Sequence, residues 1–297
     1  MSVKTSKSAY RGRFAPSPTG ELHFGSLVAA VGSFLRARAR GGRWLIRIED
    51  IDPPREVPGA AASQLRTLAT FGLVPDEPVM FQSRLADRHR QAVQQLMETG
   101  HAFPCACSRR DLPADGIYPG TCRNGIAAGK TARSIRVRVA DEAIEFCDGI
   151  QGLQSHNPAR QTGDFIIRRA DGLIAYQLAV VVDDAASSIT EVVRGADLID
   201  STARQLHLYR CLGLAEPDHA HLPLVVDENG NKLSKSSGAD PILRYPPAIA
   251  LRLALRVLGH EPPAALRSAA SQLEWAGRNW QFEKIPAGPA AIGVQPG

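Results

Sequence analysis

The chain has 297 residues, of which 44% are hydrophobic and 22% charged, and its 35 lysines and arginines against 30 acidic residues give a formal net charge of +5. This composition excludes a disordered, a collagen-like and a disulfide-dense chain, and the length allows about two domains. The longest apolar stretches, at 27–35 and 178–182, are well short of the roughly 18 residues that cross a membrane. The N-terminal segment is basic and lacks the apolar core of a signal peptide, so we expect a cytoplasmic protein without membrane contact.

The beginning of the chain has the pattern of a parallel α/β unit. Residues 13–15 predict a short strand, which the turn sequence PSPTG ends at Gly20. Apolar residues then recur at helical spacing over 27–35, and a second strand is predicted over 44–48. A strand, a turn with glycine, a helix and a strand in about forty residues form the βαβ unit of a parallel sheet with helices on its faces.

Two more helices are predicted over 60–71 and 87–99, and the character of the chain changes at residue 103. The segment 103–171 has clustered cysteines, Gly and Pro turns, and a strand at 135–139 whose arginines share one face. We interpret this segment as an inserted small domain.

After the insertion, the apolar runs 174–182 and 189–193 predict two buried strands that complete the parallel sheet. The pattern of 202–212 predicts an amphipathic helix, and helices are expected again from residue 246. The last dozen residues are rich in Pro and Gly, which is typical of a flexible tail.

The first candidate for chemistry is the turn before the first helix, where His23-Phe-Gly-Ser26 follows PSPTG. A glycine that allows close backbone approach, beside a helix N-terminus with free N–H groups, is suited to bind phosphate. His23 adds a donor that can stabilise charge on a phosphoryl oxygen. The alternative is an ordinary turn and helix cap that contains a histidine by chance.

The second candidate is the segment NKLSKSSG at 231–238, with Lys232 and Lys235 among three serines. Flexible ammonium groups beside hydroxyl donors suit the moving charge of a departing pyrophosphate. The alternative is a solvated loop.

The third candidate is a group of three cysteines, Cys105, Cys107 and Cys122, with Tyr118 between them. An odd, clustered set of cysteines favours a metal site in a reducing compartment over a disulfide framework. Zinc prefers thiolates in a closed tetrahedron, and three sulfurs leave one position for Tyr118, His101 or water. The alternative is that these cysteines bind no metal.

The segments HFGS at 23–26 and KLSKS at 232–236 resemble the HIGH and KMSKS signatures of the class I aminoacyl-tRNA synthetases. Within that family the chain resembles the glutamyl branch. The segments RFAPSPTGELHFGS, IRIEDIDPPRE, YQLAVVVDD, VVRGADLIDST and KLSKS occur in the order of that branch, from about residue 11 to residue 240.

The resemblance implies an α/β fold in which a Rossmann-type doubly wound parallel sheet carries an inserted small zinc-bearing domain and precedes a short C-terminal helical region. The implied division is 1–102 for the first half of the catalytic domain, 103–171 for an inserted acceptor-binding-like domain with the zinc site, 172–245 for the second half with the KLSKS loop, and 246–297 for the C-terminal helical region and flexible tail.

The resemblance also implies roles for single residues. Guanidinium groups bind carboxylates as a fork, which suits a glutamate substrate, and the implied glutamate-binding residues are Arg13, Ala15, Ser17, Glu49, Tyr176 and Arg194, with Glu49 on the α-ammonium group. The implied ATP-binding residues are Pro16, His23, Gly25, Ser26 and Lys235, and the catalytic residues are His23, Lys232 and Lys235. For Glu49 and Arg194 the alternative is an ordinary ion pair at a strand end.

The implied chemistry has two steps. The α-carboxylate of glutamate attacks the α-phosphate of ATP, which enters with Mg²⁺, and the activated glutamyl group then passes to a hydroxyl. Relatives of this branch also carry zinc on a Cys-x-Cys…Tyr-x-x-x-Cys pattern, which is present here as Cys105, Cys107, Tyr118 and Cys122.

The segment after the KLSKS loop is short for the anticodon-reading domain of a bacterial glutamyl-tRNA synthetase, and we expect none here. In this the chain resembles the glutamyl-queuosine tRNA(Asp) synthetases, which activate glutamate without tRNA and transfer it to the queuosine base in the anticodon of tRNA(Asp). We expect a monomer. The arginines of 135–139, Arg168, Arg169 and the C-terminal helices are candidates to contact RNA phosphates, and the alternative is that they are solvated surface residues. The alternatives are a minimal enzyme that charges tRNA(Glu), an inert RNA-binding relative and a small-molecule nucleotidyltransferase.

Overall fold

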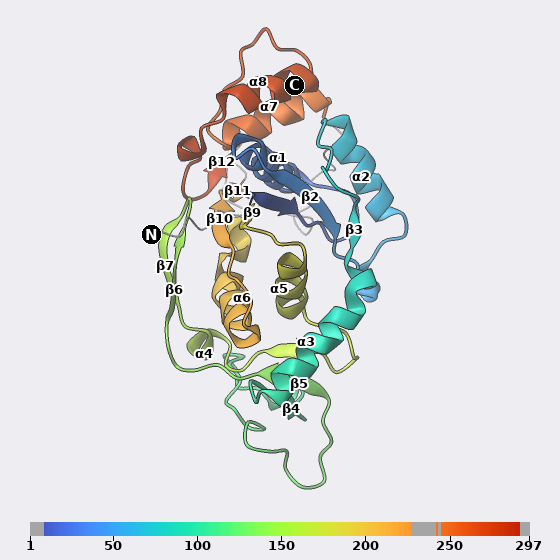
Figure 1. Ribbon diagram of the computed structural model, residues 1–297, viewed down its shortest axis with the longest axis vertical. Helices are drawn as coiled ribbons and strands as arrows, with labels where there is room; N and C mark the ends of the chain where they lie inside the picture. The colour runs from blue at the N-terminus through green and yellow to red at the C-terminus, as the bar shows by residue number, and fades with distance from the viewer. Residues whose placement is uncertain (1–8, 227–241, 243–244, 292–297) are drawn as a thin grey trace, which may run out of the picture.

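The N-terminal βαβ unit forms as predicted in the computed structural model, which describes residues 9–226, 242 and 245–291 (Figure 1). Strands β1 (Arg11–Phe14) and β2 (Arg43–Ile48) pair in parallel, with Arg13 opposite Leu45, and α1 (Phe24–Ala39) connects them. Strand β3 (Met80–Phe81) continues the sheet beyond β2. Trp44 anchors the unit because its fully buried ring packs edge-on against Phe34 and its indole N–H donates to Ser33 Oγ at 3.0 Å.

The second part of the parallel sheet lies on the other side of β1. The backbone N–H of Thr190 donates to the carbonyl of Arg11, which brings β9 (Glu191–Gly195) beside β1. Strand β10 (Asp218–Leu222) pairs in parallel with β9 and with β6 (Ile144–Asp148), and β7 (Gly152–His156) is antiparallel to β6 at the edge. The helix between β9 and β10 is α6 (Ile199–Leu212), which confirms the predicted helix over 202–212.

The predicted strand over 174–182 is wrong, because this segment forms α5 (Tyr176–Ala186). An unbroken apolar run does not distinguish a buried strand from a buried helix by its periodicity. Here Leu178 and Val181 pack against α6 and against α3 (Ala86–Glu98) in one hydrophobic cluster, so the helix is buried on most sides. The strand predicted over 189–193 is confirmed as β9.

Most of a small antiparallel sheet lies within 103–171, the segment that we interpret as an insertion, and its strands are β4 (Ala102–Cys105), β5 (Ser134–Val137) and β8 (Ile166–Arg168). The expectation that the arginines of 135–139 face RNA is wrong for Arg136, which is only 5% exposed. Its guanidinium donates to the carbonyl of Asp164 at 2.7 Å and lies inside the insertion, while Arg138 donates to the carbonyls of Gly100 and Arg123. These arginines therefore hold the insertion together.

The C-terminal helices α7 (Pro247–Val257) and α8 (Ala269–Asn279) cover α1 through a cluster that includes Leu251, Leu255 and Ala276. They lie at one end of the long axis, and β4 and β5 lie at the other (Figure 1). The predicted flexible tail is wrong for Ala290–Ala291, which form β12 in parallel with β11 (Val225–Val226), whereas 292–297 are outside the described residues.

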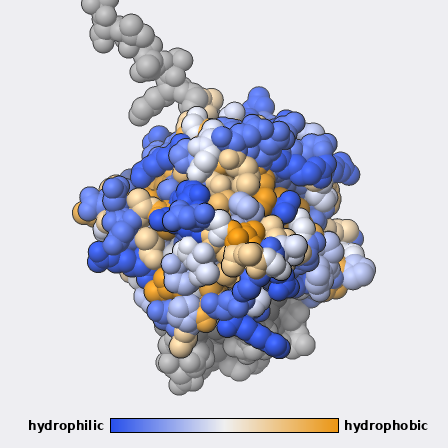
Figure 2. All heavy atoms as spheres, turned by 90° about the horizontal axis from the view of Figure 1, so that it is seen from below, coloured by the Kyte–Doolittle hydropathy of each residue, from blue (hydrophilic) through white to orange (hydrophobic). Residues whose placement is uncertain are grey.

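The remaining elements are short or peripheral: helices α2 (Ala60–Thr70) and α4 (Pro158–Gln161), and 3-10 helices at Pro53–Arg55, Gln82–Leu85, Arg109–Asp111, Ala196–Leu198 and Phe282–Lys284. No helix in the described part of the chain is both long and apolar enough to cross a membrane. Seen from the end that carries the insertion, the surface is largely hydrophilic, with hydrophobic side chains in smaller patches (Figure 2).

Candidate active site

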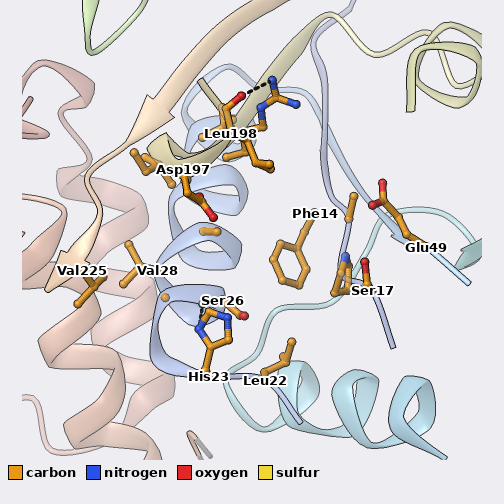
Figure 3. Close-up of a pocket in the computed structure, with 18 of the residues that line it drawn as sticks. Phe14, Ser17, Leu22, His23, Ser26, Val28, Glu49, Asp197, Leu198 and Val225 are labelled. Atoms are coloured by element: carbon orange, nitrogen blue, oxygen red, sulfur yellow. Dashed lines mark hydrogen bonds between the residues drawn. The ribbon is translucent and has the colours of Figure 1, made fainter. Parts of the chain in front are cut away.

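A pocket of about 510 Å³ lies at the carboxyl ends of β1, β9 and β10, beside the N-terminus of α1 (Figure 3). Ligands of open α/β sheets bind at this edge, because the loops that follow the strands meet there. The lining includes the ten residues of the described part of the chain that were predicted to bind glutamate or ATP: Arg13, Ala15, Pro16, Ser17, His23, Gly25, Ser26, Glu49, Tyr176 and Arg194. Lys232 and Lys235 are outside the described residues.

The turn before α1 has the geometry of an anion site. His23 is the N-cap of α1, and its Nδ1 accepts the backbone N–H of Ser26 at 3.2 Å, so the ring lies over the first turn (Figure 3). A Cβ on Gly25 would come within 3.2 Å of the His23 ring, so a larger residue at this position would require the ring to shift. The first backbone N–H groups of a long helix carry partial positive charge, and this end of α1 faces the pocket.

A network of buried charges supports the wall formed by β1, β2 and α5. Arg13 donates to both carboxylate oxygens of Asp184 at 3.0 Å, and Arg47 donates to Asp184 at 2.5 Å and to Glu49 at 3.0 Å. All four side chains are less than 9% exposed. Burial alone would raise the pKa of Asp184, but the two guanidinium groups outweigh it and lower this pKa to about 2. At neutral pH Asp184 is therefore a carboxylate.

Glu49 has a different balance, since burial raises its pKa and the pull of Arg47 only partly offsets this. A second cation near the Glu49 carboxylate would favour its charged form. A positively charged ligand group in the pocket would therefore stabilise the charged form of Glu49.

Sequence reasoning missed Arg47 and Asp184. The signal was present, because Arg47 lies in the segment IRIED and Asp184 ends YQLAVVVDD, but both were considered only as part of a motif. A second carboxylate of that motif, Asp183, accepts from Gln82 and contacts His89 Nε2 at 2.8 Å, so it points away from Arg13 and supports α3.

The opposite wall presents Arg194 at the end of β9. Its guanidinium donates to His221 Nε2 at 3.0 Å, Gln205 Oε1 at 2.8 Å, Thr202 Oγ1 at 2.9 Å and the carbonyl of Leu198 at 3.2 Å, the last of which Figure 3 shows. Arg13 and Arg194 are 4% and 5% exposed, and both line the pocket. Two fixed guanidinium groups and one carboxylate in a single pocket match the three charges of an acidic amino acid.

The three predicted cysteines of the insertion come together. The Sγ atoms of Cys105, Cys107 and Cys122 all lie within 4.8 Å of one another, and those of Cys107 and Cys122 are 3.7 Å apart. Tetrahedral bonds of about 2.3 Å to a zinc ion would separate two sulfurs by about 3.8 Å, so the spacing fits such an ion. The Tyr118 hydroxyl oxygen is 3.5 Å from Cys105 Sγ, which fits a ligand on the same ion.

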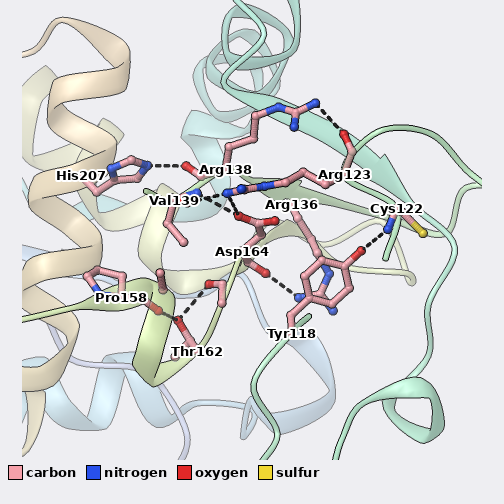
Figure 4. Close-up of polar contacts among 12 residues, drawn as sticks. Tyr118, Cys122, Arg123, Arg136, Arg138, Val139, Pro158, Thr162, Asp164 and His207 are labelled. Carbon is pink, nitrogen blue, oxygen red and sulfur yellow. Dashed lines mark hydrogen bonds and ion pairs between the residues drawn. The ribbon is translucent and has the colours of Figure 1, made fainter. Parts of the chain in front are cut away.

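The surroundings of the cysteines favour a thiolate at Cys105. Arg136 donates from Nε to Cys105 Sγ at 3.4 Å. Its guanidinium lies 3.9 Å above the centre of the Tyr118 ring and also donates from Nη1 to the carbonyl of Asp164, as Figure 4 shows. Burial opposes charge on Cys105, but its hydrogen bonds with Tyr118, the backbone of Cys107 and Arg136 lower its pKa to about 7. Burial and the neighbouring thiols of Cys122 and Cys105 raise the pKa of Cys107 to about 11.

The chain matches the family model of the class I tRNA synthetases for E and Q, catalytic domain, over residues 9–115 and 118–242. The glutamyl-Q tRNA(Asp) synthetase of Aromatoleum aromaticum is 52% identical over 286 residues, which cover 93% of this chain and 90% of that protein. The protein of the same name from Chromobacterium violaceum is 50% identical over 97% of this chain and 99% of its own length.

Solved structures agree with this assignment. The glutamate-tRNA synthetase of Elizabethkingia anophelis superposes with a TM-score of 0.82 at 26% identity, over 97% of this chain and 68% of that one. The glutamate tRNA ligase of Elizabethkingia meningosepticum, solved in complex with its amino acid, gives 0.81 at 25% identity, over 96% of this chain and 67% of that one. The chain belongs to the class I tRNA synthetases of the E and Q type, and within them to the glutamyl-Q tRNA(Asp) synthetase family.

Proposed function

We propose that this protein is an ATP-dependent ligase that activates L-glutamate without tRNA and transfers it to the queuosine base in the anticodon of tRNA(Asp). The observation that carries this proposal is the identity of 50–52% to glutamyl-Q tRNA(Asp) synthetases over nearly the whole chain. It is supported by a pocket in which Arg13, Arg194 and Glu49 supply charges opposite to those of glutamate.

Glutamate binds between the two walls of the pocket. Arg13 donates from Nε and Nη2 to Asp184, and we assign its remaining donor, Nη1, to a hydrogen bond with a substrate carboxylate. Arg194 on the opposite wall takes the other carboxylate. Arg47 donates to Oε1 of Glu49, and we assign Oε2 to the α-ammonium group. Ala15, Ser17 and Tyr176 complete the lining, and burial raises the pKa of Tyr176, so its hydroxyl is a neutral donor.

ATP binds across the N-terminus of α1, where Pro16, His23, Gly25 and Ser26 line the pocket. An oxygen of the glutamate α-carboxylate attacks the α-phosphorus, the bond to the β-phosphate breaks, and pyrophosphate leaves with Mg²⁺. His23 stabilises the charge that develops on the α-phosphate, and Lys232 and Lys235 stabilise the departing pyrophosphate. In the second step a hydroxyl of the queuosine cyclopentenediol attacks the glutamyl carbonyl and AMP leaves.

The insertion binds one zinc ion through Cys105, Cys107 and Cys122, with Tyr118 as the fourth ligand. The distances among these side chains support the proposal, and the Tyr118 hydroxyl also accepts the backbone N–H of Cys122 at 2.7 Å, which holds it near the thiols. Such a closed four-ligand site is structural, so the ion would stabilise the fold of the insertion. The adenylation step uses no residue of this site.

The alternative acceptor, tRNA(Glu), is not favoured. The relatives named as glutamyl-Q tRNA(Asp) synthetases are 50–52% identical to this chain, whereas the superposed glutamate-tRNA synthetase is 26% identical and extends well beyond the matched part.

The test of the activation step is exchange of labelled pyrophosphate into ATP without any RNA. We expect exchange that depends on L-glutamate and that is absent with L-aspartate or L-glutamine. Arg194→Gln should lower kcat/KM for glutamate by about thirtyfold or more, the cost of truncating a buried charge partner. Arg160→Gln is the matched control, because Arg160 pairs with Asp141 on the surface. Exchange that needs tRNA(Glu), or equal rates for both variants, would contradict the proposal.

A further inference from the structure

Arg194 is held by neutral partners, in contrast to Arg13. Arg13 pairs directly with the carboxylate of Asp184. Each of the four partners of Arg194 in the described part of the chain is uncharged: an imidazole, an amide, a hydroxyl and a carbonyl. Its positive charge is therefore fixed in place without a carboxylate in direct contact, which leaves the charge for a ligand.

The imidazole among these partners belongs to His221, which is fully buried on β10 directly opposite Arg194 on β9. A guanidinium group has no acceptor, so the contact between Arg194 Nε and His221 Nε2 at 3.0 Å requires a lone pair on Nε2. The proton of the neutral ring is then on Nδ1, which lies 2.5 Å from Asp148 Oδ2.

Asp148 is itself held in a fixed orientation at the end of β6. Its Oδ1 accepts the backbone N–H groups of Ile150, Gln151 and His221 at 2.9–3.0 Å, which leaves Oδ2 for the imidazole. Asp148 is 2% exposed. In the described part of the chain no arginine or lysine forms a salt bridge with it, and its side-chain partner is His221.

We propose that Asp148 and His221 are positioning residues, which set the tautomer of His221 so that its Nε2 orients the Arg194 guanidinium toward the substrate carboxylate. The inference rests on the proposed function, because it assigns Arg194 to glutamate. The imidazole of His221 separates the Asp148 carboxylate from Arg194. A carboxylate in direct contact, such as Asp184 on Arg13, offsets part of the charge of an arginine, whereas a neutral acceptor orients Arg194 without this offset.

The electrostatic surroundings keep His221 neutral. Burial lowers its pKa, the hydrogen bond that Nδ1 donates to Asp148 opposes this, and the positive charge of Arg194 lowers it again, with a net decrease. Thr202 Oγ1 lies 3.3 Å from Nε2, and the ring of His219, whose pKa burial lowers strongly, stacks on His221 with centroids 6.2 Å apart. A proton on Nε2 would face the N–H of Arg194, so the charged ring is disfavoured.

Asp148→Asn tests the tautomer with little change of shape. The amide oxygen takes the place of Oδ1 and keeps the three backbone hydrogen bonds, so the amide NH₂ faces His221 Nδ1. The ring then carries its proton on Nε2, where it opposes the N–H of Arg194. We expect KM for glutamate in the exchange reaction to rise about tenfold or more, the scale of one unsatisfied buried hydrogen bond, with KM for ATP within about twofold of the parent.

A second pair of variants keeps the test valid if Asp148→Asn does not fold. His221→Gln places an amide oxygen near the Nε2 position and keeps an acceptor for Arg194, whereas His221→Asn is too short to reach it. We expect His221→Gln to stay nearer the parent KM for glutamate than His221→Asn. A merely structural role predicts that both lower the melting temperature with the same KM.

The tautomer itself is measured by ¹⁵N NMR of labelled histidine. We expect the His221 proton on Nδ1 in the parent and on Nε2 in Asp148→Asn. A parent ring protonated on Nε2, or an unchanged KM for glutamate in a folded variant with the reversed tautomer, would overturn the inference. A parent protein with the expected tautomer and no glutamate-dependent exchange would instead contradict the proposed function.

Discussion

Replacing Asp184 by Asn removes the one negative charge that Arg13 and Arg47 share. Arg13, Arg47 and Asp184 are 4%, 2% and 1% exposed, so water does not take over the role of the carboxylate. Asn keeps one oxygen acceptor, and Arg47 keeps its hydrogen bond to Glu49 at 3.0 Å. Arg13 loses its bidentate partner, and its positive charge is left buried.

Removing one member of a buried ion pair costs about 3–5 kcal/mol of the free energy of unfolding, because the other charge remains without a partner. For a chain of this length, about 2 °C of melting temperature is lost per kcal/mol. We therefore expect the melting temperature of Asp184→Asn to fall by about 6–10 °C. KM for glutamate should rise about tenfold or more, since the direction of Arg13 is no longer fixed, with little change in KM for ATP.

Calorimetry and pyrophosphate exchange measure the two effects. Asp141→Asn is the matched control. Asp141, like Asp184, accepts hydrogen bonds from an arginine, and it accepts one from Asn157, but it lies exposed on the surface. Its melting temperature and exchange kinetics should match those of the parent, because exposed ion pairs contribute little. Equal losses in the two variants, or an unchanged KM for glutamate in Asp184→Asn, would refute the reasoning.

Three further predictions concern other parts of the molecule. Lys235→Ala should slow adenylate formation by about a hundredfold, the scale of one preorganised electrostatic partner, and near-normal pyrophosphate exchange would contradict its role. The insertion should hold one zinc ion per chain by atomic absorption, lost in Cys107→Ser, and parent protein that folds with no metal in chelator would rule the site out. Burial lowers the pKa of four histidines, His207, His219, His221 and His260, so below about pH 6.5 the unfolded chain binds protons that the folded chain does not bind. The free energy of unfolding should therefore fall as the pH is lowered from about 6.5. Equal melting temperatures at pH 7.5 and pH 5.5 would exclude this effect.

Local signals made the first part of the molecule predictable. The turn between β1 and α1, with His23 and Gly25, is specified by residues that are close in the chain. The family resemblance, and not a local signal, predicted Glu49, Tyr176 and Arg194, which line the same pocket. The segment 174–182 was not predictable in the same way, because a helix that is buried on most sides has the same unbroken apolar sequence as a buried strand.

Contacts between distant residues account for what the sequence did not reveal. Asp184 and Arg13 are 171 residues apart, and His221 and Asp148 are 73 residues apart, so nothing in the local sequence connects them. Arg136 shows the same limit: its strand position was predicted, but its direction into the insertion depends on Cys105, Tyr118 and the carbonyl of Asp164. Alternation along a strand gives two faces without saying which one is buried.

The choice of acceptor RNA tests the central claim most directly. Labelled glutamate and ATP are incubated with the protein and, in parallel, with tRNA(Asp) that contains queuosine, the same tRNA without this modification, and tRNA(Glu). We predict ATP-dependent label on the first RNA alone. Label on tRNA(Glu) in place of queuosine-containing tRNA(Asp) would contradict the proposed acceptor.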